Sequence, residues 1–140
     1  MKPYLQNTLS VIAGIVAGSA LNMGIVLVGP YLIPPPAGVD MTTAEGLKQA
    51  MAVLQPVHFI MPFLAHALGT LAGAALTAIL VARPVKPLPP LIIGFFFLAG
   101  GIINIAMIPA PLWFNVLDLL AAYLPMAWIG FRIVKSYRHE

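Results

Sequence analysis

Few side chains in this chain could do chemistry, and they lie within segments that are otherwise apolar. Asp118 is the only acidic residue inside any of these segments. An ionisable side chain within a bilayer is costly, and it usually faces the protein interior beside a partner. Counted from the segment ends, His58, Asn104 and Asn115 fall at the same depth as Asp118, in the outer half of a membrane. We therefore predict a polar cluster in which Asp118 pairs with His58 and both asparagines add hydrogen bonds.

Two further polar side chains, Asn22 and His66, are expected deeper, near the middle of the membrane. His66 could be an axial ligand for haem. A metal site could combine both histidines with Asp118, and copper could add Met61 or Met107. The two histidines are, however, separated by about 12 Å along a helix, so they cannot easily share one ion. We expect no cofactor and no metal site, with haem, a metal or a pigment as the alternatives.

A polar cluster of this kind has a structural and a functional interpretation. In the structural one, hydrogen bonds between side chains fix the register of neighbouring helices. In the functional one, Asp118 and His58 are a titratable pair that serves the passage of a proton or solute. Passage needs a continuous polar route, yet the other half of each segment is nearly all apolar. We favour the structural interpretation.

No arrangement typical of an enzyme accompanies these residues. The chain has no Cys, which excludes thiol catalysis, disulfides and iron–sulfur clusters. It has no paired carboxylates, no G-x-S-x-G, no phosphate-binding glycine loop and no H-E-x-x-H. The basic tail from Arg132 to Arg138 is too thin for nucleic acid and suits anionic lipid headgroups. We predict that the protein is not an enzyme and does not bind nucleic acid.

The composition shows what kind of elements must position these side chains. Of 140 residues, 61% are apolar and 8% are charged, and the mean hydropathy is +0.98. A soluble domain has roughly 25% charged residues. Soluble enzymes and disordered chains are therefore excluded, the latter because they are poor in apolar residues. A small integral membrane protein remains.

Four stretches have the roughly 20 apolar residues that a membrane-crossing helix needs. They cover about residues 8–28, 57–82, 91–108 and 113–134. Gly29-Pro30 and the prolines around residues 34, 84–90 and 109–111 are expected to end them, whereas Pro62 and Pro125 should kink helices from within. We predict a single all-α domain over residues 1–140, an integral membrane four-helix bundle.

A short amphipathic helix is expected in the first outer loop. Thr42 and Glu45 have the spacing of a capping box, in which each side chain satisfies a free amide at a helix start. Leu47, Met51 and Leu54 then fall on one face. The helix is expected to lie on the bundle or in the membrane interface, and a lid that binds a partner is the alternative.

The basic residues predict the orientation. Six of the seven Lys and Arg residues lie at the amino end, in the middle loop or in the carboxyl tail, and only Lys48 lies elsewhere. Four spans place both termini and the middle loop on one side. By the positive-inside bias that side is cytoplasmic.

Small residues at a spacing of four predict how the helices pack. Gly14 and Gly18 lie in the first span, and Gly69 and Gly73 lie in the second. In lipid, such residues let two helix backbones approach closely. We predict that these four glycines lie at helix–helix contacts.

Three segments carry a resemblance to a group of small bacterial four-span inner-membrane proteins. They are the Pro34–Asp40 stretch PPPAGVD, the Ala67–Ala74 stretch ALGTLAGA and the Met107–Phe114 stretch MIPAPLWF. The resemblance covers most of the chain. It implies a bacterial origin, a multi-pass location in the inner membrane and a common fold, and it implies no activity and no functional residues.

The spans are rich in packing motifs and poor in chemistry. We therefore predict a non-enzymatic accessory or scaffold subunit that packs in a homo-oligomer or a larger membrane complex. One alternative is a small oligomeric transporter or channel that uses the cluster of His58, Asn104, Asn115 and Asp118. Another is a membrane protein that binds a cofactor or lipid in a pocket below the outer loop.

Overall fold

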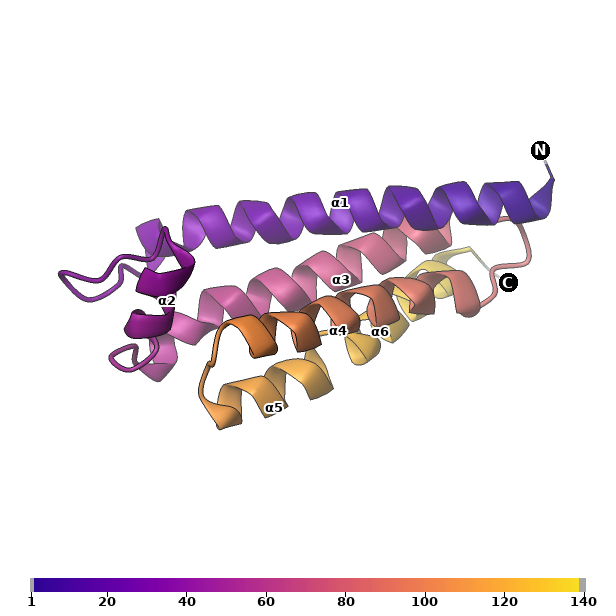
Figure 1. Ribbon diagram of the computed structural model, residues 1–140. Coiled ribbons are helices and arrows are strands. Elements are labelled where there is room, and N and C mark those ends of the chain that lie inside the picture. Colours follow the sequence, from indigo (N-terminus) through magenta and orange to yellow (C-terminus); the bar gives the residue numbers. More distant parts are fainter. Residues whose placement is uncertain (1, 139–140) are drawn as a thin grey trace.

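The computed structural model describes residues 2–138, and all its regular elements are helical (Figure 1). In chain order they are α1 (Pro3–Leu32), α2 (Ala44–Ala50), the 3-10 turn η1 (Pro56–Phe59), α3 (Ile60–Leu80), α4 (Leu88–Met107), α5 (Leu112–Ala121) and α6 (Leu124–Tyr137). Four segments are long and apolar enough to cross a membrane: α1, η1 with α3, α4, and α5 with α6. The predicted all-α bundle of four long apolar helices, with a short helix between the first two spans, is confirmed.

The bundle has two ends with different contents. The start of α1, the α3–α4 loop and the end of α6 lie together at one end, which we call the inner end (Figure 1). The long loop that carries α2 and the α4–α5 turn lie at the opposite, outer end. Six basic residues belong to the inner-end segments: Lys2, Arg83, Lys86, Arg132, Lys135 and Arg138. Lys48, in α2, belongs to the outer end.

Helix α1 is longer than predicted, because it passes through Pro30 and ends at Leu32. Proline removes one intrahelical hydrogen bond, here within a turn of the helix end, where little helix is left to disrupt. The Ile33 amide still closes the last turn on the Gly29 carbonyl at 2.9 Å. The predicted stop at Gly29-Pro30 is therefore wrong, and the chain leaves the helix just before the proline run that starts at Pro34.

The two prolines predicted to kink helices act at helix starts instead. Pro62 falls in the first turn of α3, where its missing amide costs no intrahelical bond. Pro125 lies in the first turn of α6 and divides the fourth span into α5 and α6. A proline ring clashes with the carbonyl four residues earlier, which here belongs to Ala121, the last residue of α5. The predicted continuous helix over 113–134 is therefore two helices with a break around Tyr123.

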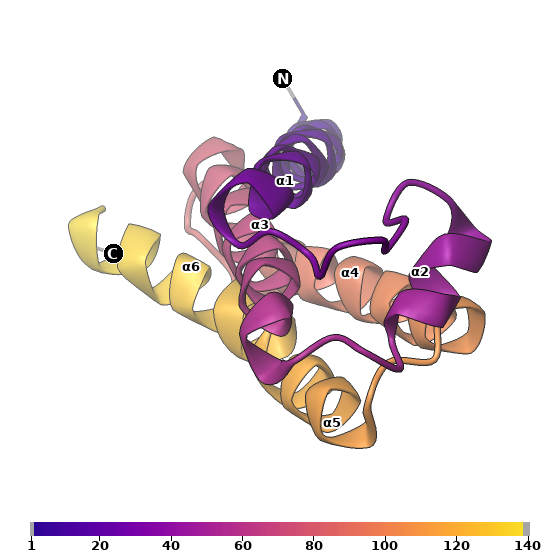
Figure 2. The same cartoon turned by 90° about the vertical axis from the view of Figure 1, so that its left-hand side faces the viewer.

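The inner part of the bundle is held by close backbone contact between α1 and α3. A Cβ atom on Gly73 would lie 2.6 Å from the Gly14 carbonyl oxygen, and one on Gly18 would lie 2.7 Å from the Gly69 oxygen. Only glycine fits at such an approach. The structure thus places the four glycines singled out in the sequence opposite one another. In the view along the bundle, α1 and α6 lie on opposite sides of α3 (Figure 2).

Helix α6 packs on α3 in the same way, through one further glycine. A Cβ on Gly130 would lie 2.7 Å from the carbonyl oxygen of Leu71. Phe131 and Val134 of α6 are buried with Ala78 and Val81 at this contact. The inner half is therefore closely packed by small and apolar side chains.

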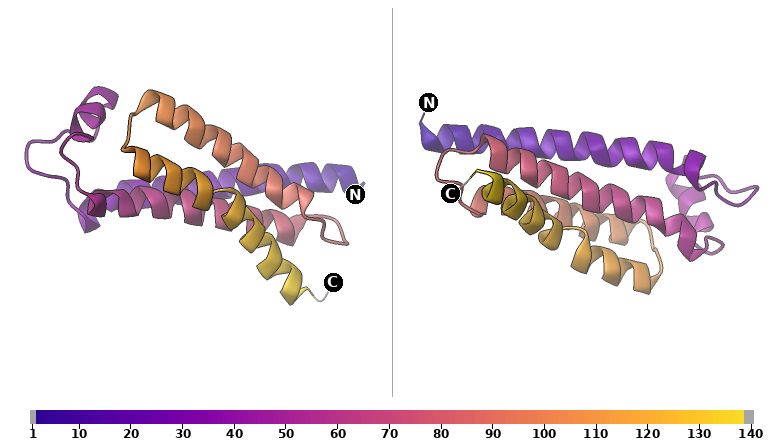
Figure 3. Two further views of the ribbon diagram at one scale, coloured as in Figure 1. Left: turned by 90° about the horizontal axis from the view of Figure 1, so that it is seen from below. Right: turned by 180° about the vertical axis from the view of Figure 1, so that it is seen from behind.

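The outer end is more open, because α4 diverges from α1 towards the α4–α5 turn (Figure 3). Helix α2 covers this end, and its N-cap is Thr43, whose hydroxyl accepts the Gly46 amide at 3.1 Å. The predicted cap at Thr42 is off by one, since the Thr42 hydroxyl instead donates to the Asp40 carboxylate at 2.6 Å.

Candidate functional site

Asp118, His66 and Tyr123 form a hydrogen-bonded triad inside the outer half of the bundle. His66 Nδ1 lies 2.9 Å from both carboxylate oxygens of Asp118. The Tyr123 hydroxyl donates to Asp118 Oδ2 at 2.7 Å and lies 3.1 Å from His66 Nδ1. Asp118 is 4% exposed and Tyr123 is 2% exposed. The carboxylate therefore faces the bundle interior with two partners, as an ionisable group within a membrane should.

Three different segments bring the triad together. His66 lies on α3 between Ala65 and Ala67, which are both buried. Asp118 is one of two buried residues of the short helix α5, and Tyr123 occupies the break before α6. The break turns the Tyr123 ring back onto the imidazole, with the ring centroids 5.7 Å apart and the planes at 29°. The helix interruption thus positions the phenol.

Gly101 of α4 makes room for that phenol. A Cβ at this position would lie 2.5 Å from the Tyr123 hydroxyl oxygen and 2.8 Å from Cζ. The glycine is buried and its helix conformation is ordinary, so the requirement here is space. Helix α4 therefore contributes to the triad by leaving a gap for it.

The contact with Asp118 bears on which imidazole nitrogen carries a proton. An ionised carboxylate only accepts, and beside an ionised Asp118 it is therefore Nδ1–H of His66 that donates. In a neutral ring this leaves Nε2 as an acceptor. The His66 side chain is 20% exposed, so one side of the ring remains open. A carboxylate behind a histidine in this way orients the ring for whatever its other nitrogen meets.

The predicted pairing of Asp118 with His58 is wrong. His58 lies in the 3-10 turn above α3, where its Nδ1 accepts the Gln55 amide at 3.0 Å and its Nε2 is 3.2 Å from the Pro34 carbonyl. The membrane-spanning segment begins at Pro56, so His58 lies in its first turn, at the outer end of the bundle. His58 therefore caps a turn and ties the outer loop to it.

The two asparagines of the predicted cluster make no hydrogen bond to Asp118 either, within residues 2–138. The Asn115 amide donates to the Ala110 carbonyl at 3.1 Å and so closes the α4–α5 turn. Asn104 lies on an exposed position of α4. Both residues nevertheless line the same cavity as Asp118.

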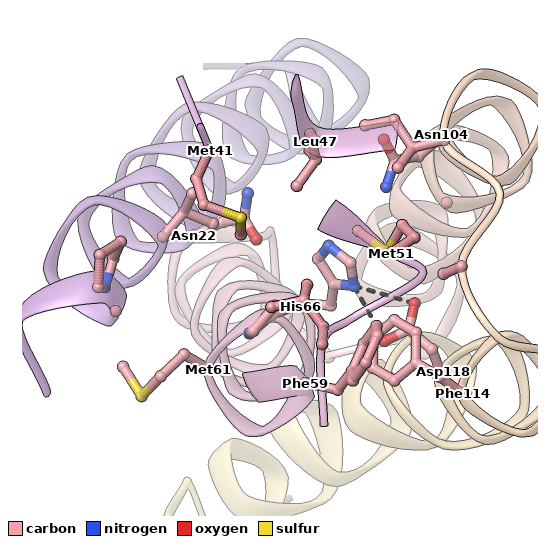
Figure 4. Close-up of a pocket in the computed structure, with 18 of the residues that line it drawn as sticks. Asn22, Met41, Leu47, Met51, Phe59, Met61, His66, Asn104, Phe114 and Asp118 are labelled. Carbon is pink, nitrogen blue, oxygen red and sulfur yellow. Dashed lines mark hydrogen bonds and ion pairs between the residues drawn. The ribbon is translucent and has the colours of Figure 1, made fainter. Parts of the chain in front are cut away.

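That cavity, of about 1080 Å³, occupies the space between α1, α3, α4 and α5 below the outer loop (Figure 4). Its polar lining comprises Asn22, Tyr31, Asp40, Thr42, His66, Thr70, Asn104, Asn115, Asp118 and Tyr123. In Figure 4 the imidazole of His66 lies between Asn22 and Asp118. Leu47, Met51 and Leu54, from the loop that carries α2, contribute apolar cover. Five of the six polar residues singled out in the sequence thus line one cavity, and His58 does not.

Two polar atoms in the cavity wall have no hydrogen-bond partner among the residues described. They are Asn22 Oδ1 and Thr70 Oγ1, and both atoms are buried. Sequence reasoning missed Thr70 and Tyr123. Thr70 follows His66 by one helical turn, and Tyr123 precedes Pro125 within an apolar span, so helical spacing and the proline were the available signals.

Over residues 2–138, no three His, Asp or Glu side chains gather into a group that could hold a metal ion. Comparison of the chain with family models, with curated proteins and with solved structures gives no match.

Proposed function

We propose that this protein is a non-enzymatic, multi-pass membrane protein that binds an amphiphilic molecule in the cavity of its outer half. The observation that carries the proposal is the buried triad of His66, Asp118 and Tyr123 in the wall of that cavity. Sites for small molecules are concave and mostly apolar, with a few fixed polar groups that orient the ligand. Their volumes are roughly 300–1,000 Å³, and this cavity is of that size.

The location of the cavity favours a ligand that arrives from the lipid phase. Its walls include Val26 of α1 and Ile105 of α4, the two helices that diverge at the outer end. Below it, His66 offers a hydrogen bond at the depth where lipid cannot supply one. An amphiphile with an apolar body and a polar end matches both parts of this lining.

A channel or transporter has less support than a binding site. A route across the membrane would have to continue from Thr70 to the inner end. There, Gly14 of α1 packs on Gly73 of α3, and Thr77 and Ile93 are fully buried. Thr77 Oγ1 lies 2.9 Å from the Gly73 carbonyl oxygen and 3.2 Å from that of Ser10, so its one proton is used within the protein. The cavity is therefore lined by residues of the outer half alone.

The test is to fill the cavity and measure the ligand content. Gly100 lines the cavity, and a Cβ there would meet no atom within 4 Å, so Gly100→Leu adds bulk without a clash at its base. Gly24 of α1 is equally unhindered and does not line the cavity, so Gly24→Leu is the matched control. Organic extracts of the purified proteins are compared by mass spectrometry. A co-purifying lipid should fall at least about fivefold in Gly100→Leu only; equal amounts in all three proteins would refute the proposal.

An accessory or scaffold role is a second candidate, and α1 supports it. This helix packs mainly through its glycine stripe and leaves an apolar side exposed along its length. Ile12, Val16 and Met23 are 52%, 63% and 55% exposed on it. The test is pull-down from native membranes extracted with a mild detergent. A stoichiometric partner that is lost in Val16→Trp would support this role, and a monomer without a partner would exclude it.

The proposal includes an orientation and a location. The concentration of basic residues at the inner end supports a cytoplasmic inner end, with both termini inside. The cavity and α2 would then face the outer side of a bacterial inner membrane. The ligand would accordingly come from the outer leaflet.

A further inference from the structure

Thr70 has an unusual hydroxyl. Its side chain is 0% exposed, yet Oγ1 has no partner in the described part of the chain. A hydroxyl within a helix commonly donates to the carbonyl one turn earlier. Thr77 does this to the Gly73 oxygen at 2.9 Å, and Ser10 does it to the Gln6 oxygen at 2.7 Å. Thr70 makes no such bond and lines the cavity instead, so a partner for it has to come from the cavity.

Asn22 adds a second unpartnered atom in the wall of the same cavity. Its Oδ1 is buried without a donor, and a Cβ on Gly69 would lie 3.0 Å from Asn22 Cβ. Gly69 and Thr70 follow His66 by three and four positions, so each is a neighbour of His66 on the surface of α3. Asn22, His66 and Thr70 all line the cavity, and we treat them as one polar patch.

The acceptor atoms of this patch need a hydrogen-bond donor from the ligand. Asn22 Oδ1 is an acceptor, and so is Nε2 of a neutral His66 whose Nδ1–H donates a hydrogen bond to Asp118. The hydroxyl of Thr70 donates as well as accepts. A ligand with acceptors alone, such as an ether or ketone, would leave both acceptors of the patch without a donor. A hydroxyl group on the ligand can donate one hydrogen bond and accept another, and so it suits Asn22, His66 and Thr70.

The charged side chains of the cavity wall narrow the class of ligand further. No Lys or Arg lines the cavity, so nothing there compensates a phosphate or carboxylate. The Asp118 carboxylate already accepts bonds on both oxygens, from His66 and Tyr123. The other carboxylate, Asp40 at the outer end, accepts from Thr42 and its neighbour. Neither calls for a cationic headgroup, and burying an uncompensated charge is costly.

We infer that the ligand is a neutral lipid that ends in a hydroxyl group. This rests on the binding function proposed above and names its ligand class. The hydroxyl would lie at Asn22, His66 and Thr70, and the hydrocarbon would lie against the apolar walls towards the outer end, which include Val26, Phe59, Ile105 and Phe114. A straight acyl chain and a branched isoprenoid chain can both carry such a group.

The probe is a photoreactive C18 alcohol, crosslinked to the purified protein in phosphatidylcholine vesicles. Four competitors of matched length are added at equal mole fraction in the lipid: oleyl alcohol, oleyl methyl ether, oleic acid and oleylamine. Geranylgeraniol, also an alcohol, tests whether the ligand has a branched isoprenoid chain. Because one hydrogen bond changes affinity by about fivefold, an alcohol should compete at least about fivefold better than the ether, the acid or the amine. The better of the two alcohols identifies the chain type.

Two variants separate the ligand class from the binding function. Thr70→Val keeps the shape of the side chain and removes the hydroxyl, so the preference for alcohol over ether should fall by about fivefold. Thr77→Val makes the same change outside the cavity and should keep the preference. If competitors act equally in the wild type, or if Thr70→Val keeps the preference, the hydroxyl inference is wrong while binding stands. If Gly100→Leu crosslinks as much probe as the wild type, the binding function fails as well.

Discussion

His66 Nδ1 lies 2.9 Å from each carboxylate oxygen of Asp118, although 52 positions separate the two residues in the sequence. The pair connects α3 to α5, a helix of ten residues in which only Phe114 and Asp118 are buried. Helix α5 therefore depends on this polar contact for its place in the bundle more than the longer helices depend on any one side chain.

Removal of the carboxylate should destabilise the fold strongly. Asp118→Ala leaves His66 and Tyr123 without their acceptor in a buried place, and loss of one partner of a buried pair costs about 3 kcal/mol. Asp118→Asn keeps the shape and one acceptor, so it should cost about half as much. The free energy of unfolding in mixed micelles measures this. Leu120→Ala, at a 70% exposed position of α5, is the control and should change little.

The Tyr123 hydroxyl should contribute through the same carboxylate. Tyr123→Phe removes a hydrogen bond of 2.7 Å to a charged acceptor, and such bonds contribute about 1.5 kcal/mol or more. In the Asp118→Asn background the acceptor is weaker, so the loss should be smaller. A double-mutant cycle in mixed micelles measures the difference. Additive effects would show that the phenol acts only by filling space.

Close packing of α1 on α3 predicts a contrast between two glycines. Gly73→Leu drives a side chain into the Gly14 backbone, because even a Cβ would lie 2.6 Å from its carbonyl oxygen. Gly24→Leu on α1 meets no atom within 4 Å. The first variant should lose monodisperse protein on size exclusion or melt at least about 5 °C lower. Equal behaviour of the two would show that α1 does not pack on α3 through this stripe.

Protonation of Asp40 at low pH should destabilise the outer loop. The Thr42 hydroxyl, the Thr42 amide and the Thr43 hydroxyl donate to its carboxylate and hold its pKa below the usual 3.8. A lowered pKa means that this group stabilises the loop above pH 3.8, and that the contribution is lost as the pH falls through the lower folded value. Carbon NMR of labelled aspartate carboxyls should show it. Thr42→Val should move the midpoint up towards 3.8, and an unmoved midpoint would contradict the loop geometry.

Orientation is testable with single cysteines, since the chain contains none. Lys48→Cys, in α2, should react with an impermeant maleimide added to intact cells. Arg138→Cys, at the end of α6, should react only after the membrane is opened. Labelling of the second variant from outside would reverse the orientation proposed here.

The sequence predicts the fold well because apolar length and small-residue spacing act locally. The four spans and the glycine stripe of α1 and α3 can be read without knowing any partner. Depth inside the membrane is harder, since it is counted from where a helix begins. Counting from the outer end of the second span placed His58 level with Asp118, whereas the structure brings His66, further along the same span, to that level instead.

The break at Tyr123 could not be predicted from the sequence, for a related reason. Pro125 signals a disturbance, but whether a proline kinks a helix or starts a new one depends on what its neighbours can pack against. Here the Tyr123 phenol hydrogen-bonds Asp118 Oδ2 and fits the space beside Gly101, and both contacts stabilise the break. The inward orientation of Asp118 can be predicted from the cost of exposing an ionisable side chain to lipid. Which residue it pairs with depends on contacts between segments far apart in the sequence.

The break before α6 also has a consequence for the order in which the chain enters the membrane. Helix α5, with ten residues, is too short to cross alone and carries a carboxylate, so it can enter stably only together with α6. Its histidine partner lies on α3 and is synthesised earlier. The histidine that pairs with Asp118 is therefore synthesised before the carboxylate that needs it. A reversed order would leave the acidic segment without a partner during insertion.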